Sequence, residues 1–512
     1  MRIALDLPPG LNSDDTAFAA APSWRDCSNV RFRLGRAETI GGWESVTSST
    51  LTGVCRTAFA WTDNSSLQHL GLATHSKLYV WKSGDLADIT PSSGFTAGAI
   101  DGAGSAGYGT GSYGVGDYGE PSASDYFPLT WSLGAYGQTL IASPRNQTIF
   151  QWSNNTAVVA AAVTNAPANV TYALVAPQRQ VFALGCNEET SGTFNPMCIR
   201  HSGVAAITNW TTTSSSASTA REYVLPGGGR IVGGRVIGRS ILVWTNHSLW
   251  LGTYYGQIQK VWSFDKVGDG CGLIGPNAAA IKGSTAFWIS PDRQFYSYSP
   301  GGGVQSIACP IREDFADNLA ASQSDKIVAS TITEYGEVRW DYPDDRDGYE
   351  NSRYIALCVD GPDAGSWYRG TMARTAMVDA GPTTYPCGVT YGGAIYWHER
   401  GASADGSALS WHIETADTYL DENFAVLVRQ LWPDITGAGG AQQGAVNLTL
   451  TSRYHPQGDT VTYGAYAMTP SQDSVDFKAS GRLFRVKFSG SSAPTSARLG
   501  RMSFDVKLRG RK

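Results

Sequence analysis

The chain has 512 residues, of which 42% are hydrophobic and only 16% are charged, and it is rich in glycine (59), tyrosine (24) and tryptophan (16). This composition excludes a disordered chain, a coiled coil and a helical bundle, and it favours strands and turns in about three domains. A net charge of −5 excludes a generally basic nucleic-acid-binding protein, and no apolar run approaches the roughly 20 residues of a membrane span.

Residues 1–50 are expected to form an N-terminal platform segment. The sequence predicts a strand from Val30 to Arg33, a glycine turn and a return strand over 36–40. Arg31 and Arg33 fall on one side of the first strand, and Gly41 and Gly42 lead to Trp43. We expect Arg31, Arg33 and Trp43 to lie at an interface with a neighbouring subunit or an adaptor protein.

A recurring hairpin organises the centre of the chain. Residues 71–81, 140–152, 242–251 and 287–298 each contain an apolar strand, a polar turn and an aromatic-rich strand, and weaker copies occur at 181–202, 338–359 and 394–413. The turns are about 46 to 57 residues apart, except for a first gap of about 70, and they lie near Ser76, Asn146, Gly192, Asn246, Asp292, Asp347 and Ala404.

A repeat of this length built from short strands is typical of a β-propeller, because one blade alone cannot bury both of its faces. We therefore predict an all-β protein with a propeller over 51–420. It has about seven blades, with six and eight left open. The alternative is a set of β-sandwiches with irregular strand spacing.

The long first gap contains a glycine-rich insert. Residues 94–119 include ten glycines, and Tyr108, Tyr113 and Tyr118 recur beside them. The backbone entropy of such a segment disfavours a blade, so we predict a projecting loop. Tyrosine supplies contact area at low entropic cost, which favours a channel-lining or contact role for these residues. A flexible linker is the alternative.

The segment 421–512 has the alternating pattern of half-buried strands, and we predict a C-terminal β-sandwich that joins the N-terminal segment in one platform. Between Lys478 and Lys512 there are ten basic residues and one acid. We expect this end of the chain to meet an acidic partner, with solvated strand faces as the alternative. The expected subunit or adaptor contacts are Arg482, Arg485, Lys487 and Arg501.

The sequence contains no recognisable catalytic or cofactor motif. There is no nucleophile elbow, zinc-protease helix or phosphate-binding loop, and the seven histidines are scattered. The acidic stretch 341–350 could bind calcium, but its spacing favours a solvated hairpin loop. The eight cysteines are expected to be reduced core residues, with Cys186 and Cys198 close enough in sequence for a local bridge. We predict a protein that is not an enzyme and has no cofactor or metal.

Three segments carry a resemblance to a known family. They are PPGLNSDD at 8–15 followed by WRDCSNVRFRLGRAETIGGW at 24–43, the Gly-Tyr-Gly insert, and GRMSFDV at 500–506. Together they resemble the nozzle or tail-hub proteins, also called packaged-DNA stabilisation proteins, of short-tailed bacteriophages (podoviruses). The likeness covers the two ends of the chain and one insert, about a fifth of the sequence.

The resemblance implies a structural virion protein of the phage tail, assembled in the cytoplasm of the bacterial host. Such proteins form a ring, commonly a homohexamer, below the portal and the head-to-tail adaptor. The ring retains packaged double-stranded DNA and conducts it during ejection, beside a fibre or tailspike and a needle or tip. A net negative body suits a conduit because it does not grip the passing polyanion. The alternatives are a host-attachment propeller that binds or cleaves surface glycans, and a propeller scaffold of the host cell.

Overall fold

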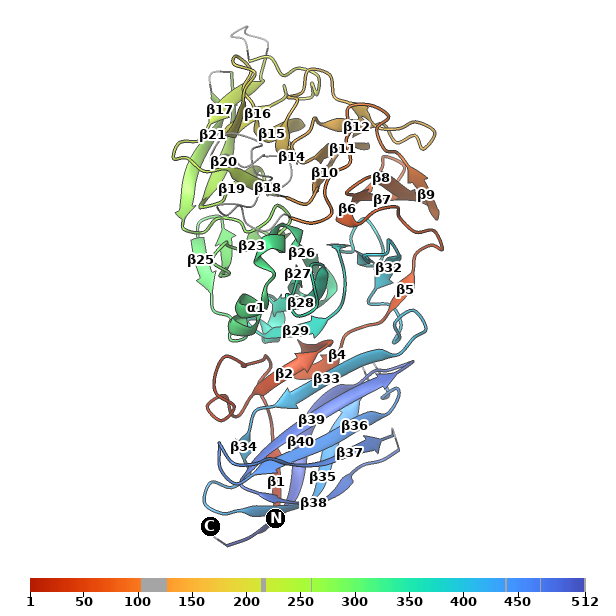
Figure 1. The fold of residues 1–512 in the computed structure, drawn as a ribbon, viewed down its shortest axis with the longest axis vertical. Helices are drawn as coiled ribbons and strands as arrows, with labels where there is room; N and C mark the ends of the chain where they lie inside the picture. Colours follow the sequence, from red (N-terminus) through yellow and green to blue (C-terminus); the bar gives the residue numbers. More distant parts are fainter. Residues whose placement is uncertain (103–126, 213–217, 259, 438–439, 470, 511–512) are drawn as a thin grey trace, which may run out of the picture.

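The computed structural model describes residues 1–102, 127–212, 218–258, 260–437, 440–469 and 471–510. The chain forms two parts, a ring of four-stranded sheets and a sandwich of two six-stranded sheets (Figure 1). No helix in the described residues is long and apolar enough to cross a membrane.

Seven four-stranded antiparallel sheets form the blades of the propeller. From inner to outer strand, blades 1 to 3 are β6 (Cys55–Thr62), β7 (Gln68–Thr74), β8 (Leu78–Lys82) and β9 (Asp85–Asp88); β10 (Trp131–Tyr136), β11 (Thr139–Pro144), β12 (Phe150–Trp152) and β13 (Ala161–Ala162); and β14 (Val170–Ala176), β15 (Gln180–Asn187), β16 (Phe194–His201) and β17 (Arg221–Val224).

Blades 4 to 7 follow the same order along the chain, except at the last strand. They are β18 (Ile231–Ile237), β19 (Ser240–Thr245), β20 (Ser248–Gln257) and β21 (Lys260–Asp269); β22 (Ala279–Lys282), β23 (Thr285–Ile289), β24 (Phe295–Ser299) and β25 (Gly303–Ile307); β26 (Val328–Ile332), β27 (Glu337–Pro343), β28 (Asn351–Cys358) and β29 (Trp367–Thr371); and β30 (Ala376–Val378), β31 (Cys387–Val389), β32 (Ile395–His398) and β5 (Trp43–Ser45).

The inner strands close into a ring. Each contacts the inner strand of the next blade, and β30 of blade 7 contacts β6 of blade 1. The ring is also fastened at its edge, because β5, from the start of the chain, supplies the fourth strand of blade 7. These contacts confirm an all-β propeller and settle the number of blades at seven.

Six of the seven predicted turns join the second and third strands of a blade, as the repeat requires. The seventh was predicted wrongly. Blade 7 makes that turn between β31 and β32, around Thr390 and Ala394, and Ala404 lies beyond the last blade. The predicted copy at 394–413 therefore spans the end of the propeller and part of the sandwich.

Buried tryptophans pack the blades against one another. The indole nitrogens of Trp131, Trp288 and Trp340 donate hydrogen bonds to backbone carbonyl oxygens of Thr74, Cys271 and Ala278, respectively. Each of these indoles is at most 1% exposed, so the apolar ring fills the space between blades while its N–H is satisfied.

The sandwich is made from both ends of the chain. One sheet, here called sheet A, contains β1 (Arg2–Leu5), β3 (Val30–Arg33), β4 (Arg36–Thr39), β35 (Val426–Thr436), β38 (Val475–Gly481) and β40 (Arg498–Leu508). The other, sheet B, contains β2 (Trp24–Ser28), β33 (Leu409–Thr415), β34 (Thr418–Tyr419), β36 (Val446–Arg453), β37 (Val461–Met468) and β39 (Leu483–Ser492). Strand β33 was predicted as part of the propeller, but its alternating core residues pack inside the sandwich.

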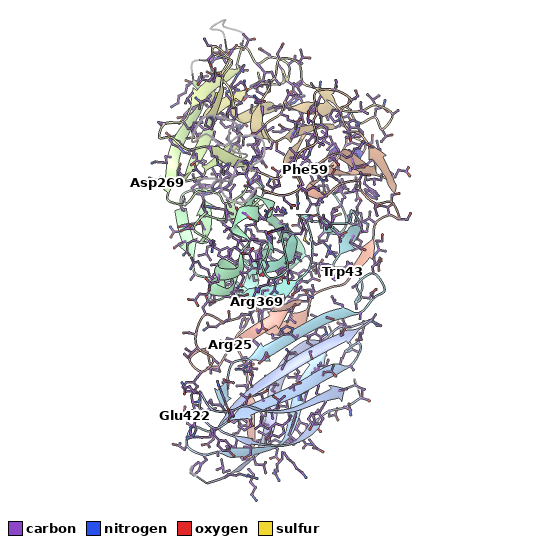
Figure 2. The ribbon with its side chains drawn as sticks, in the orientation of Figure 1. Arg25, Trp43, Phe59, Asp269, Arg369 and Glu422 are labelled. Carbon is purple, nitrogen blue, oxygen red and sulfur yellow. The ribbon has the colours of Figure 1, made fainter. Side chains whose placement is uncertain are left out.

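The sandwich sits against blade 6 (Figure 1). Strand β29 contacts β2 and β3, and Arg369 of β29 pairs with Asp26 of β2 at 2.8 Å. Arg25 and Arg369 mark this joint in Figure 2. The described helices are short connectors near blades 5 and 6, namely α1 (Arg312–Asn318), η1 (Ala321–Lys326), η2 (Thr333–Tyr335) and η3 (Gly361–Asp363).

Candidate functional site

Charged side chains gather where the inner strands of the propeller begin. Arg56, the second residue of β6, is 1% exposed and forms a two-pronged ion pair with Glu350, with both nitrogen–oxygen distances at 2.7 Å. Lys326, at the end of η1, reaches the same carboxylate at 2.8 Å and Asp101 at 2.6 Å. Blades 1 and 6 and the start of the insert are therefore tied together by one charge network.

Hydrogen bonds cross the axis of the ring at this end. Asn277, just before the inner strand of blade 5, donates to the carbonyl oxygen of Arg56 at 3.3 Å and to the Thr57 hydroxyl at 3.1 Å, both in blade 1. Blades 1 and 5 are not neighbours in the ring, so these bonds span its centre. Within the described residues, side chains therefore bridge the mouth of the propeller across its axis.

The described residues on either side of 103–126, Gly102 and Phe127, are held at this mouth. The Gln323 amide donates to the carbonyl of Gly102 at 2.8 Å and accepts from its N–H at 2.9 Å. On the other side of the insert, the Phe127 ring lies between the guanidinium groups of Arg145, at 3.9 Å, and Arg230, at 4.3 Å. Such cation–π contacts are strongest when they are removed from water, and Arg145 is only 6% exposed.

The tyrosines predicted to line a channel or to make contacts, Tyr108, Tyr113 and Tyr118, lie outside the described residues. Gly102 and Phe127 fix where the insert leaves and rejoins the propeller. The charge network beside them was not found from the sequence, because Arg56, Asp101, Lys326 and Glu350 come from separate segments and only the ring closure brings them together.

Arg31 is enclosed within the chain. It is 1% exposed, and its guanidinium pairs with Glu337 at 3.1 Å and with both oxygens of Glu399 at 2.6 and 2.8 Å. Its charged plane also lies over the Tyr335 ring at 3.7 Å. The prediction of a subunit contact at Arg31 is therefore corrected, because this residue of β3 joins the sandwich to blades 6 and 7.

Glu337 is the member of this joint whose pKa is shifted toward neutral pH. It is fully buried, and burial raises the pKa of its carboxyl group to about 7 although the Arg31 guanidinium opposes the shift. Glu399 raises the pKa further, whereas Arg339 and Tyr368 lower it. A carboxyl group that titrates near neutral pH therefore lies between the two parts of the chain.

The other two predicted N-terminal contacts lie in different surroundings. Trp43 begins β5 and so belongs to the seventh blade, where the Arg374 guanidinium lies 4.9 Å from its ring and His398 packs beside it. Arg33 is exposed at the end of β3, with Glu38 at 3.7 Å. Of the three residues, Arg33 is the most accessible to another molecule.

The predicted basic contacts divide between opposite faces of the sandwich, because β39 belongs to sheet B and β40 to sheet A. On β39, Arg485 pairs with Asp417 and Glu414, both at 3.0 Å, and Lys487 lies 4.0 Å from Glu414. Arg482 donates to the carbonyl oxygen of Glu422. Arg501 of β40 is exposed, and none of the ion pairs among the described residues involves it. Most of the charge on β39 is thus compensated within the chain, and that of Arg501 is not.

The acidic stretch 341–350 is also compensated. Asp341 pairs with Arg339, Asp344 with Arg346 and Arg353, and Asp347 with Arg353. No group of three metal-ligating side chains occurs in the part of the chain that the structure describes. The Cys186 and Cys198 sulfur atoms lie 3.9 Å apart as free thiols, so they are in contact without being bonded.

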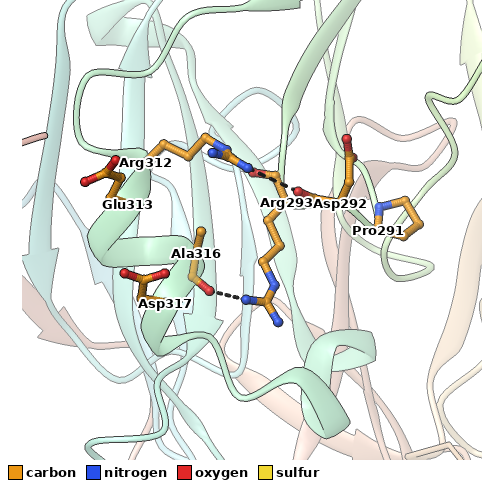
Figure 3. Close-up of a pocket in the computed structure, with 7 residues that line it drawn as sticks. All are labelled: Pro291, Asp292, Arg293, Arg312, Glu313, Ala316 and Asp317. Carbon is orange, nitrogen blue, oxygen red and sulfur yellow. Dashed lines mark hydrogen bonds between the residues drawn. The ribbon is translucent and has the colours of Figure 1, made fainter.

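A hollow of about 690 Å³ lies between blade 5 and α1 (Figure 3). The Arg312 side chain donates a hydrogen bond to the backbone carbonyl oxygen of Arg293, and the Arg293 side chain donates one to that of Ala316. Asp292, Glu313 and Asp317 remain exposed at its rim. Its lining offers no histidine or nucleophile and consists of Pro291, Asp292, Arg293, Arg312, Glu313, Ala316 and Asp317.

No family model and no curated protein matches the chain. Among solved structures, the chain is similar to one described as BBS1N in complex with ARL6DN, with 11% identity, 72% of this chain and 99% of that chain covered, and a TM-score of 0.42. It is also similar to the computationally designed Ika8 protein, with 12% identity, 77% and 99% coverage, and a TM-score of 0.37. Both scores are low, and neither likeness bears on what the chain does.

Proposed function

We propose that this protein is a structural component of a short-tailed phage tail, in which copies form a ring-shaped nozzle or hub below the portal and adaptor. The ring retains packaged double-stranded DNA and conducts it during ejection, without an enzymatic step. The sequence resemblance at the chain ends is the origin of this proposal, since a propeller fold alone does not choose a function.

One observation carries the proposal furthest. The two terminal segments that resemble the family, 24–43 and 500–506, lie almost at opposite ends of the sequence, and yet their strands share one sandwich. Strand β4 pairs directly with β40, with Ala37 opposite Leu499 and Glu38 opposite Arg498. Segments that resemble the family's ends thus form one structural unit, as a shared platform requires.

The closed mouth of the propeller supports a passage between copies. Bonds from Asn277 to blade 1 cross the axis of the ring, so a double helix cannot pass through a single copy without breaking them. A conduit built from this chain must therefore lie on the common axis of several copies. Heterologous contacts that close on themselves produce such an axis.

Electron microscopy of the purified protein, alone and with adaptor-bearing heads, tests the proposal. We expect a hollow ring that attaches to the heads and is required for them to keep their DNA. Heads that retain DNA equally well without the protein would refute it. Specific binding or turnover on a glycan array by a chain that forms no ring would favour the attachment alternative instead.

A further inference from the structure

Strand β37 is an open edge of the sandwich. It ends sheet B, pairs only with β36, and has no partner on its outer side among the described residues. Six of its eight residues are exposed, and the sequence VTYGAYAM contains no charge and no proline. An exposed edge presents a row of unpaired backbone N–H and C=O groups that can pair with another strand.

The neighbouring edge strand of the sandwich, β38, carries charged side chains that protect it from pairing with another strand. Strand β38 ends sheet A on the same side, and it turns Asp476 and Lys478 outward between its buried residues. Charged side chains of this kind, lysine above all, are how natural sheets prevent pairing at an edge. Strand β37 has no charged residue. Its pairing with β36 shifts register once, between Tyr463 and Tyr466, and the residues on either side of this bulge keep a free edge that is suited to accept a strand from another chain.

A second free edge lies on the opposite side of the sandwich. Residues 502–505 of β40 pair with β35 on one side and with β1 on the other, and β1 has no further partner among the described strands. Strand β38 lies on the far side of β35 from β40, and β37 contacts β38, so the free edges of β37 and β1 lie on opposite sides of the sandwich. Opposite edges allow copies to join head to tail, which is the heterologous contact that closes a ring.

The charges near the two edges are complementary. Asp459, Asp473 and Asp476 are exposed beside β37 and β38, where they outnumber the exposed Lys478 of β38, and no ion pair among the described residues involves these three carboxylates. Near the opposite edge, Arg2 of β1 and Arg501 of β40 are exposed, and the Arg2 guanidinium lies over the Trp432 ring. Like edges would bring like charges together, whereas unlike edges attract.

We propose that β37 of one copy pairs with β1 of a second copy of this chain, so that the two sandwiches join edge to edge. The inference rests on the proposed ring and names the strands that build it. It also gives Arg501, whose charge the fold leaves uncompensated, a partner surface on the neighbouring copy.

The first test introduces charged side chains on β37. The double variant Thr462→Lys/Ala467→Lys adds two lysines at exposed positions, and we expect its association between copies to fall at least tenfold while its circular dichroism and melting temperature match the wild type. The matched control is Gln305→Lys/Ser306→Lys, which adds the same charge to β25, the exposed outer strand of blade 5. The control should assemble like the wild type.

Cysteine cross-linking provides the second test. Ala4→Cys, on the exposed face of β1, is combined in turn with cysteine at each position of β37. We expect disulfides between copies at alternate positions within 461–463 and within 466–468, the stretches on either side of the register shift, because side chains of a strand alternate between faces. The native cysteines are buried or half-buried, which keeps the signal specific.

Rings that persist in the lysine variant, or rings without any cross-link from β1 to β37, overturn the edge pairing and leave the proposed function standing. A wild-type chain that forms no ring, either alone or on adaptor-bearing heads, overturns both.

Discussion

Replacing Glu337 with glutamine tests the chemistry of the joint between the sandwich and the propeller. Glutamine keeps the size of the side chain and remains uncharged at every pH. The Glu337 carboxyl group is fully buried, and burial raises its pKa from 4.5 to about 7 against the opposing charge of Arg31. The carboxyl group therefore binds its proton more tightly in the folded chain than in the unfolded chain.

The difference in pKa between the folded and unfolded states makes the stability of the wild type depend on pH. Between pH 4.5 and pH 7 the folded state holds the proton and the unfolded state releases it, so the wild type loses stability as the pH rises and levels off above pH 7. From pH 5 to pH 8 the raised pKa corresponds to a loss on the order of 2 to 3 kcal/mol. Glu337→Gln removes this contribution, so the variant should gain about that much relative to the wild type across the range.

The measurement is denaturant unfolding of both proteins at pH 5, 6, 7 and 8, followed by tryptophan fluorescence. The difference between variant and wild type isolates residue 337 from every other titrating group. Glu334→Gln is the control, because Glu334 is an exposed carboxylate three residues away and its replacement removes a charge without touching the buried joint, so it should not reproduce the gain. A variant whose advantage is the same at pH 5 and pH 8 would refute the reasoning.

Three further predictions concern the mouth of the propeller and the sandwich. Arg56→Met should destabilise the propeller by about 3 kcal/mol in denaturant unfolding, because it leaves a partly buried carboxylate without its main partner, whereas Arg239→Met, at an exposed turn, should change little. Arg485→Glu should lower the unfolding midpoint, because it places a third carboxylate beside Glu414 and Asp417. Arg501→Glu should keep the free energy of unfolding within about 0.5 kcal/mol of the wild type but reduce ring assembly, measured by light scattering. Deleting 104–125 keeps both anchors of the insert and should leave the melting temperature unchanged but impair DNA retention; filled, infectious particles would contradict the predicted channel role.

The propeller was predictable because its signal is repeated. Each blade needs an apolar second strand, a polar turn and an aromatic third strand, so the pattern recurs at a nearly fixed interval. The prediction failed at the last copy because ring closure replaces one repeat strand with β5 from the start of the chain. The three residues of β5 are too short to carry a pattern of their own.

The interface residues were harder to predict, because strand periodicity gives the face of a residue but not what covers that face. Arg31 alternates as an outward residue of β3, and only the fold shows that Glu337 and Glu399 cover it. Arg485 and Arg501 look alike in the sequence, and yet they lie on opposite sheets and only Arg485 meets acids of its own chain. Pairs separated by tens to hundreds of residues leave no local signal in a single sequence.

The bridged propeller mouth and the free sandwich edges together indicate that the sandwich, rather than the propeller, makes the contacts between copies. Bonds across the axis and the buried Arg56 network bridge the inner strands of the described propeller, so a double helix would have to break them to pass through one copy. The sandwich, in contrast, keeps an unguarded edge on one side and a second free edge on the other. If copies join through these edges, the proposed passage for DNA lies between molecules, and its width is set by the angle at which one sandwich meets the next.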